Sequence, residues 1–507
     1  MSAKVLLSGS FLRLVALLTG MAISLFMMPF LVKSLGDHWY GLWVLVASTL
    51  GFYGVLDLGL SSATQRFISH ALGQDDKPEM NSVLSNSLAL FTGIGLVAAI
   101  ITTVIALVSP LFFSSAVDAE IFRSIVLLMG FALALNFVMN AYNGVLVAYY
   151  RFDIQAKVTL FKNIFRALAV VLVFQVDPSV MNLALITVLF DLIGHWIILR
   201  SSMRQAPWIS PSVKLLSKHQ IKQLTGFGWF SFLVFVGLQI RNKGPYFIVA
   251  STLSIASVTV FQIANQLISY LNQLQTSVFG VLTPYFTKTY SQNHRDKLNA
   301  HYLLSLKLSA ISASVLAGSM ILLGRPFIHA WMGPSYDEAY LTLIPIAIGT
   351  YCASIHAPSF QLLQAMARHR YYSYFGLVEG ILIIGVGIWA TEVFGLIGIG
   401  YSIGGILGVS RFLLMPVMVS KITNISWRKI YAAGSRVTLL TILVHGLMWL
   451  SLVQIGIENQ LFIAMPTVIM LYVVGLPALL YLSLTAMERQ LVAGIIRQFL
   501  RKEASSS

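Results

Sequence analysis

The sequence predicts an all-α polytopic membrane protein with about fourteen transmembrane helices. Of its 507 residues, 57% are hydrophobic and only 10% are charged, whereas globular chains carry about 25% charged residues. The mean hydropathy is +0.81. Apolar stretches of roughly 20 residues, enough to cross a hydrocarbon core of about 30 Å, recur from one end of the chain to the other. A soluble domain with a separate activity is therefore not expected.

Each expected helix is an apolar run that ends at charged or turn-forming residues. The first such run, Leu14 to Val32, carries no charge and lacks the cleavage pattern of a signal peptide, so we expect it to be a retained helix. The segments 286–340 and 420–460 can be divided differently, and twelve helices are the alternative count. The expected ranges are 12–33, 40–64, 83–108, 121–149, 158–176, 180–199, 224–250, 253–286, 301–323, 339–365, 371–391, 395–420, 432–455 and 461–485.

The longest polar insert, 200–223, falls between the sixth and seventh expected helices. It predicts a division of the chain into bundles. We expect an N-terminal six-helix bundle at 1–199, a cytoplasmic linker at 200–223 and a second six-helix bundle at 224–420. Two extra helices and a cytoplasmic tail then occupy 421–507.

The chain is strongly basic, with 33 Lys and Arg against 18 Asp and Glu and a net charge of +15. In a soluble protein this balance would suggest nucleic-acid binding. Here the bases are spread through short loops, a pattern typical of membrane topology. If the N-terminus lies in the cytoplasm, most bases fall in inner loops, and acids such as Asp118, Asp177 and Glu338 fall in outer loops. We therefore expect both termini in the cytoplasm and no nucleic-acid partner.

Three carboxylates, Asp57, Asp191 and Glu379, fall within expected spans. Charges inside a bilayer are costly, so each is a candidate for ion coupling or gating. The alternative is structural, because buried acids often pair with bases. Asp191 could pair with Arg166 or Arg200, and Asp57 could be a hydrogen-bonding hub at a helix end.

Three cations, Arg241, Lys243 and Arg411, also fall within expected spans. Arg241 and Lys243 have no acid in their own segment and are predicted to line a cationic cavity. Arginine and lysine suit phosphates, so the cavity is predicted to bind an anionic headgroup; the pyrophosphate of a lipid-linked sugar would be one such group. We further assign Arg13 and Arg66 to an inner vestibule.

No catalytic or metal-binding constellation is expected. His195, His356 and His445 lie in different helices, and Cys352 is the single cysteine, which leaves no thiolate metal site. The sequence therefore predicts that the protein is not an enzyme and that it needs neither a metal nor a cofactor. A stripe of Gly400, Gly404 and Gly408 predicts that another helix approaches closely there.

The N-terminal quarter contains the run FLVKSLGDHWYGLWVLVASTLGFYGVLDLGLSSATQRFIS, with Leu35-Gly36, Tyr40 to Trp43, Leu56 to Leu60 and the basic exit Arg66. This run resembles the start of bacterial polysaccharide flippases of the multidrug/oligosaccharidyl-lipid/polysaccharide exporter superfamily. A later stretch, PYFIVASTLSIASVTVFQIANQL, is more loosely similar to the hairpin of helices seven and eight in that family. The family often has an aspartate near the middle of helix seven, where this chain has Asn242.

The resemblance implies two helix bundles around a central cavity and transport by alternating access. Its implied cargo is an undecaprenyl-pyrophosphate-linked oligosaccharide, carried across the bacterial inner membrane for surface polysaccharide such as O-antigen or lipopolysaccharide. Implied partners are the bilayer and polysaccharide polymerase and export proteins. The alternatives are a cation-coupled multidrug exporter of the same superfamily, which would need an acidic cavity, and a membrane polymerase or acyltransferase acting on lipid-linked sugars.

Overall fold

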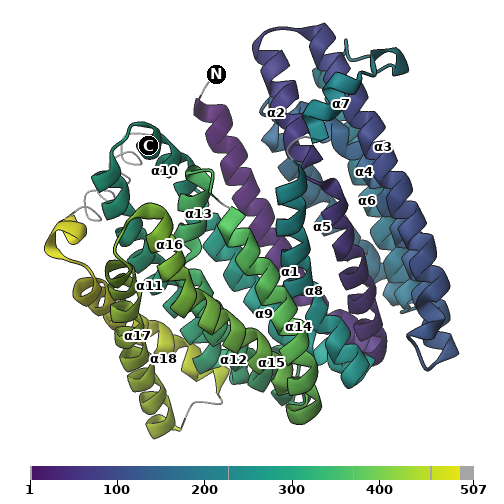
Figure 1. The fold of residues 1–507 in the computed structure, drawn as a ribbon. Helices are drawn as coiled ribbons and strands as arrows, with labels where there is room; N and C mark the ends of the chain where they lie inside the picture. The colour runs from purple at the N-terminus through teal and green to yellow at the C-terminus, as the bar shows by residue number, and fades with distance from the viewer. Residues whose placement is uncertain (1–2, 226–227, 369, 457–459, 491–507) are drawn as a thin grey trace. The chain divides into compact units, whose positions relative to one another are not determined.

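The computed structural model describes residues 3–225, 228–368, 370–456 and 460–490, which are almost entirely helical (Figure 1). No β-strand occurs in these ranges, which confirms the all-α prediction. The chain forms two compact units, Met1–Thr259 and Val260–Ser507. The boundary between them falls in a helix, whereas the polar insert 200–223 lies inside the first unit.

Among the described residues, eleven helical segments are long and apolar enough to cross a membrane. Three more, α5 (Phe152–Phe174), α8 (Gly228–Thr252) and α9 (Ile255–Phe279), have spanning length but carry more polar side chains. The resulting set agrees with the predicted twelve to fourteen helices. In a bilayer, helices of this polarity turn their polar faces toward protein or water rather than lipid.

The first unit is built from antiparallel helices in which neighbours in sequence pack together, as the contacts of α3 with α4 and of α5 with α6 show. Side-chain caps begin three of these helices: Asp76, Ser115 and Ser179 each accept a backbone N–H at a helix start, as is typical of N-caps. Besides α5, α8 and the start of α9, the unit contains α1 (Ala3–Gly51), η1 (Phe52–Asp57), α2 (Leu60–Gly73), α3 (Lys77–Val108), η2 (Ser109–Leu111), α4 (Ala116–Ala148), α6 (Val180–Gln205), η3 (Val213–Leu215) and α7 (Lys218–Thr225).

The helix expected at 40–64 is interrupted in the structure. The α-helix ends at Gly51 and is followed directly by the 3-10 segment η1. The chain then turns at Leu58 and Gly59, which have φ of 51° and 77°. Positive φ favours glycine, which explains Gly59 in the Leu-Asp-Leu-Gly-Leu motif. The chain from Leu60 to Gly73 is helical, although the expected helix ended at residue 64. The loop expected between residues 64 and 83 is therefore replaced by a turn at 74–76.

The polar insert is anchored to α3 rather than extended into solvent. Buried Asn86 donates from Nδ2 to the Leu215 carbonyl at 3.0 Å and accepts at Oδ1 from the Ser217 backbone N–H at 2.9 Å. The Ser212 backbone N–H donates to Ser85 Oγ at 3.0 Å. These bonds satisfy backbone groups that would otherwise be left unpaired.

The second unit contains both long and interrupted helices. α11 spans 37 residues, and the expected range 395–420 contains a π-helix in its middle. The remaining helices follow in chain order after α9. They are α10 (Leu282–Ser291), α11 (Arg295–Trp331), η4 (Pro334–Tyr336), α12 (Asp337–Ile355), α13 (Ala357–Ala365), α14 (Arg370–Phe394), α15 (Leu396–Leu407), η5 (Gly408–Leu414, the π-helix), α16 (Met415–Thr423), α17 (Trp427–Ile455) and α18 (Leu461–Ser483).

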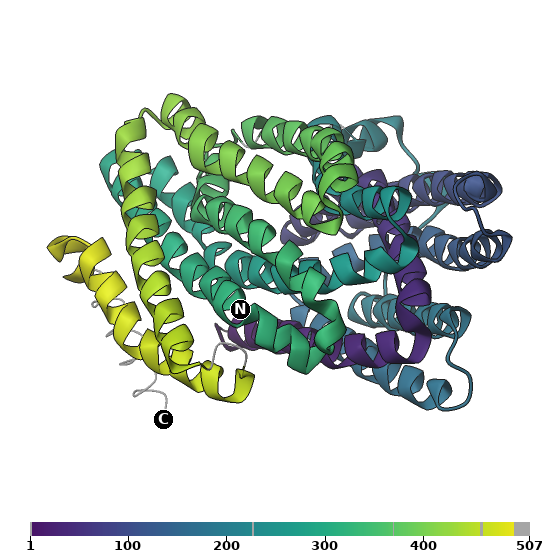
Figure 2. The ribbon, with the colours of Figure 1, turned by 90° about the horizontal axis from the view of Figure 1, so that it is seen from below.

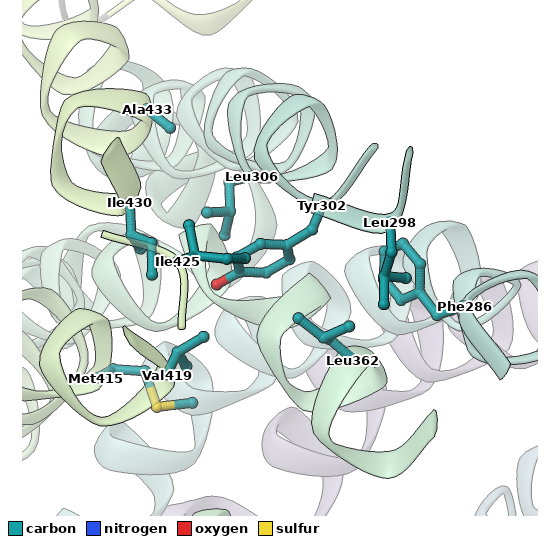
Figure 3. Packing of buried hydrophobic residues seen from close by; sticks show 10 residues of the cluster. All are labelled: Phe286, Leu298, Tyr302, Leu306, Leu362, Met415, Val419, Ile425, Ile430 and Ala433. Atoms are coloured by element: carbon teal, nitrogen blue, oxygen red, sulfur yellow. The ribbon is translucent and has the colours of Figure 1, made fainter. Parts of the chain in front are cut away.

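A buried cluster joins five helices of the second unit at one end (Figure 3). Tyr302 lies at its centre, fully buried, with its hydroxyl 2.8 Å from Ser359 Oγ. A buried tyrosine hydroxyl needs such a partner. The other members are apolar: Phe286, Leu298, Leu306, Leu362, Met415, Val419, Ile425, Ile430 and Ala433.

The glycine stripe brings α15 against α12, as predicted. A Cβ on Gly404 would lie 2.1 Å from the Pro345 carbonyl oxygen, and one on Gly400 would lie 2.9 Å from the Thr342 carbonyl oxygen. Gly408 differs, because a Cβ there would meet nothing within 4 Å. Two of the three glycines therefore serve close packing.

The two extra helices, α17 and α18, pack against α11 within the second unit (Figure 2). His445 of α17 occupies the space beside Gly318, where a Cβ would lie only 2.0 Å from its Nε2. The same nitrogen is 2.8 Å from Tyr472 Oη of α18. His445 is thus a packed core residue, as expected from its isolation in the sequence.

Candidate functional site

The break at η1 faces the polar side of α8 within the first unit. Gln239 donates from Nε2 to the carbonyl oxygen of Gly51, the last residue before η1. The stem of Lys243 lies against the same glycine, since a Cβ on Gly51 would be 3.1 Å from Lys243 Cε. Non-helical backbone at membrane depth is stable only where protein covers it or water reaches it. Two polar side chains of α8 therefore border the break.

The ammonium of Lys243 lies 5.5 Å from the ring centroid of Tyr246. Across the described ranges, Lys243 has no carboxylate partner. Lysine is a compact charge with three donors, and a half-buried one in this setting can bind an anion.

Arg241 lies half a turn before Lys243 on the same helix and is half-buried. Its Nε is 3.3 Å from Asn242 Oδ1, so the amide between the two cations accepts from the first of them. Gln239 and Lys243 are four residues apart and share one face of α8, whereas Arg241 lies about half a turn away from both.

Arg411 is placed differently from the other two cations. It lies in the π-helix η5, and its side chain is 1% exposed. Its Nη2 donates to Glu379 Oε2 at 2.7 Å, and its Nε is 2.7 Å from Oε1. From the sequence, Arg411 was expected to bind substrate and Glu379 to take part in coupling; the pairing of these two side chains was not predicted.

A hydrogen-bonded group near this pair was missed by sequence reasoning. Ser410 donates from Oγ to Glu379. His356, taken from sequence for an isolated core residue, lies at the junction of α12 and α13 with its Nδ1 3.1 Å from Ser359 Oγ. Pro358 lies in the first turn of α13, where proline is favoured, and this was the available signal for a new helix starting beside His356.

The acids of the first unit have structural partners. Asp57 Oδ1 accepts from the backbone N–H of Ser61 at 3.2 Å and from its hydroxyl at 2.7 Å, so it caps the start of α2. Asp191 pairs with Lys162 at 2.9 Å. Pairing of Asp191 was the alternative considered, but the predicted partners, Arg166 and Arg200, were the wrong ones.

The two cations assigned to an inner vestibule both contact aromatic rings. The Arg13 guanidinium carbon lies 3.9 Å from the Phe152 ring centroid, and its Nη2 is 3.5 Å from Gln155 Oε1, which ties α1 to α5. The Arg66 guanidinium lies 5.9 Å from the Phe67 ring. In the described ranges, no three His, Cys, Asp or Glu side chains are grouped to hold a metal ion.

Comparison with known proteins supports the fold and the broad function. The model of the family described as "Polysaccharide biosynthesis protein" matches residues 40–341. A protein of Bacillus subtilis (strain 168), described as "Uncharacterized membrane protein EpsK", is 24% identical over 427 residues, 81% of this chain and 82% of that protein.

Solved structures with the same fold are transporters. The lipid II flippase MurJ in an inward closed conformation has a TM-score of 0.69 and 14% identity, covering 93% of this chain and 99% of that chain. An inward-facing multidrug resistance MATE family transporter of the MOP superfamily has a TM-score of 0.67 and 14% identity, covering 82% and 99%. At these identities the likeness establishes the fold alone.

Proposed function

Because the chain belongs to the family of polysaccharide biosynthesis proteins and has the fold of membrane transporters, we propose that it is a flippase for polyprenyl-pyrophosphate-linked oligosaccharides. In this proposal it carries the lipid-linked unit across the inner membrane for surface polysaccharide assembly. Both termini lie in the cytoplasm, where most loop bases are found. Polymerase and export proteins act on the delivered unit.

The proposal rests mainly on Lys243, whose positive charge lies beside the helix break. A pyrophosphate headgroup has several anionic oxygens and needs positive charge to enter a region without bulk water. Lys243 supplies that charge without a competing carboxylate among the described residues. Arg241 is a second cation of α8, but two residues turn a helix by about 200°, so it lies on the face away from Lys243.

The charge of this site argues against a cation-coupled multidrug exporter. A cationic drug requires acidic walls, whereas the acids of the first unit named above are already engaged: Asp57 caps α2, and Asp191 pairs with Lys162. A polymerase or acyltransferase would need a catalytic group at the site. The side chains that border the break, Gln239 and Lys243, suit binding rather than covalent catalysis.

Alternating access requires bodies that keep their internal shape while they move. Each compact unit has ties of this kind. In the first, the polar insert is bound to α3 through Asn86. In the second, Glu379 and Arg411 join α14 to η5. We propose that these ties preserve each bundle during transport.

Deletion of the gene in its host tests the proposal. We expect loss of surface polysaccharide and accumulation of lipid-linked repeat units on the cytoplasmic side, both restored by the intact gene. Unchanged surface polysaccharide with altered drug sensitivity would support the exporter instead. Lipid-linked units that reach the outer face but stay unpolymerised would indicate an enzyme.

A further inference from the structure

A pocket of about 430 Å³ lies on the first unit at the C-terminal end of α6. It is separate from the break at η1 and is formed by one helix end and the chain that follows. Its lining combines apolar side chains with two guanidinium groups. The lining residues are Trp196, Leu199, Arg200, Met203, Arg204 and Pro207.

The pocket belongs to the outward face of α6. On the opposite face, Ser202 Oγ donates to the Tyr142 carbonyl at 2.9 Å, and Gln205 Oε1 accepts from Arg151 Nη1 at 2.9 Å. Those contacts fix the rotation of the helix. Trp196 and Met203, seven residues apart and therefore on one face, are left 59% and 46% exposed.

An exposed apolar stripe leads to the pocket along the same helix. Leu185, Leu189 and Leu192 are 47%, 54% and 39% exposed and precede Trp196 at spacings of three and four residues. In a membrane-spanning helix, such a face contacts acyl chains. Tryptophan is favoured at the level of lipid headgroups, so the pocket lies where the apolar stripe ends.

The two arginines of the pocket have no carboxylate partner within the described residues. The Arg200 guanidinium carbon is 5.8 Å from the Trp196 ring centroid. Arg204 lies one turn further, at the last turn of α6. Two exposed guanidinium groups, one turn apart above an apolar stripe, match a phosphate headgroup with acyl chains below it.

We infer that this pocket binds an anionic glycerophospholipid of the surrounding bilayer, with its phosphate on Arg200 and Arg204 and its chains along the α6 stripe. The site is distinct from the proposed cargo site at Lys243, and its occupancy does not depend on the cargo. A zwitterionic lipid fits less well, because its own cation competes with the guanidinium groups for the phosphate.

Native mass spectrometry of the purified full-length protein tests this inference. Cardiolipin, phosphatidylglycerol and phosphatidylcholine are added in turn, and bound lipid is counted. We expect the anionic lipids to be retained over phosphatidylcholine, and the double variant Arg200→Ala/Arg204→Ala to bind them about tenfold more weakly. Both side chains are exposed, so the variant is expected to fold.

The matched control is Arg428→Ala/Lys429→Ala, which removes two exposed charges beside another exposed tryptophan, Trp427, outside the pocket. It should retain the anionic lipids. Equal losses in both double variants would overturn the inference, because they would indicate a general charge effect. Unchanged binding by Arg200→Ala/Arg204→Ala, or preferential displacement of the lipid by polyprenyl phosphate, would overturn it as well. The last result would assign the pocket to the cargo.

Discussion

Glu379 and Arg411 form a buried two-point ion pair between α14 and the π-helix η5, with both contacts at 2.7 Å. Their side chains are only 2% and 1% exposed. The Arg411 guanidinium also lies 4.1 Å from the Tyr372 ring centroid. Each charge thus has a partner that offsets part of the cost of its burial.

Removing the cation alone should destabilise the second unit. Arg411→Met leaves the Glu379 carboxylate buried without its partner, and breaking a buried pair in this way costs about 3–5 kcal/mol. We expect a lower melting temperature and less monodisperse protein in detergent. The double variant Glu379→Leu/Arg411→Met removes both charges and should regain most of the loss. A single variant as stable as the native protein would contradict this account of the pair.

Glu379→Gln addresses the coupling role predicted from the sequence. The amide keeps the shape of the side chain but has one acceptor oxygen, whereas Ser410 and Arg411 Nη2 bond to different oxygens of the carboxylate. One of the two contacts is therefore lost, and Arg411 loses its counter-charge. We expect the variant to insert in the membrane, to melt at a lower temperature than the native protein because Arg411 is left without its counter-charge, and to assemble less surface polysaccharide. If surface polysaccharide is normal, Glu379 has no part in transport.

Lys243→Ala should impair transport without unfolding the protein. The half-buried ammonium contacts the Tyr246 ring and has no ion pair among described residues, so its loss leaves no carboxylate stranded. A charged hydrogen bond contributes about 1.5–3 kcal/mol, which predicts a loss of transport on the order of tenfold to a hundredfold. The assay is transfer of a lipid-linked sugar in proteoliposomes.

Two further variants sharpen this test. Lys243→Arg keeps the charge and should retain part of the activity. Lys214→Ala removes the same residue type from an exposed position in the polar insert and should leave transport unchanged. Equal activity of Lys243→Ala and Lys214→Ala would remove Lys243 from the cargo site.

The sequence predicts the fold class well because hydropathy and loop charge are local properties. The motif at 56–60 indicated a family resemblance, but the helix was expected to continue through Gly59, which adopts positive φ instead. The sequence does not predict which buried charges pair with each other. Asp191 and Glu379 pair with Lys162 and Arg411, each about 30 residues away in another helix. Which helices become neighbours, and how each is rotated, depends on tertiary packing.

The π-helix and the break at η1 were also beyond sequence reasoning. Both lie in apolar runs whose composition is suited to a regular helix. At the break, the Gly51 carbonyl accepts a hydrogen bond from Gln239 of α8, far along the chain. A contact between segments far apart in the chain cannot be predicted from a local sequence pattern. The helix at 40–64 was therefore expected to be continuous.

Gly404→Ala should disrupt the packing of α15 on α12. The new methyl group would lie 2.1 Å from the Pro345 carbonyl oxygen, and backbone cannot move aside cheaply. Overpacking of this kind costs about 1–3 kcal/mol. Gly408→Ala is the control from the same stripe, because its methyl group meets nothing within 4 Å. Equal melting temperatures for the two variants would contradict the close approach.

The chain just after α18 is held to α11 by Glu488. Its carboxylate accepts from Lys307 Nζ at 2.9 and 2.7 Å and from the backbone N–H of Thr485 at 2.7 Å. Burial acts to raise the pKa of Glu488, but the hydrogen bonds from Lys307 and Thr485 together outweigh it, so the pKa lies below its ordinary value. This carboxylate therefore links stability to pH.

A carboxyl group whose pKa is lowered by folding adds stability above its unfolded pKa, and that contribution is lost as the pH falls through the folded pKa. We expect Glu488→Gln to lower the melting temperature at neutral pH, and the difference from the native protein to shrink below about pH 4. Glu392→Gln, at an exposed position without an ion pair in the described chain, should show no such difference. A Glu488→Gln deficit that persisted unchanged at acidic pH would show that the contact with Lys307 does not depend on the charge of the carboxylate.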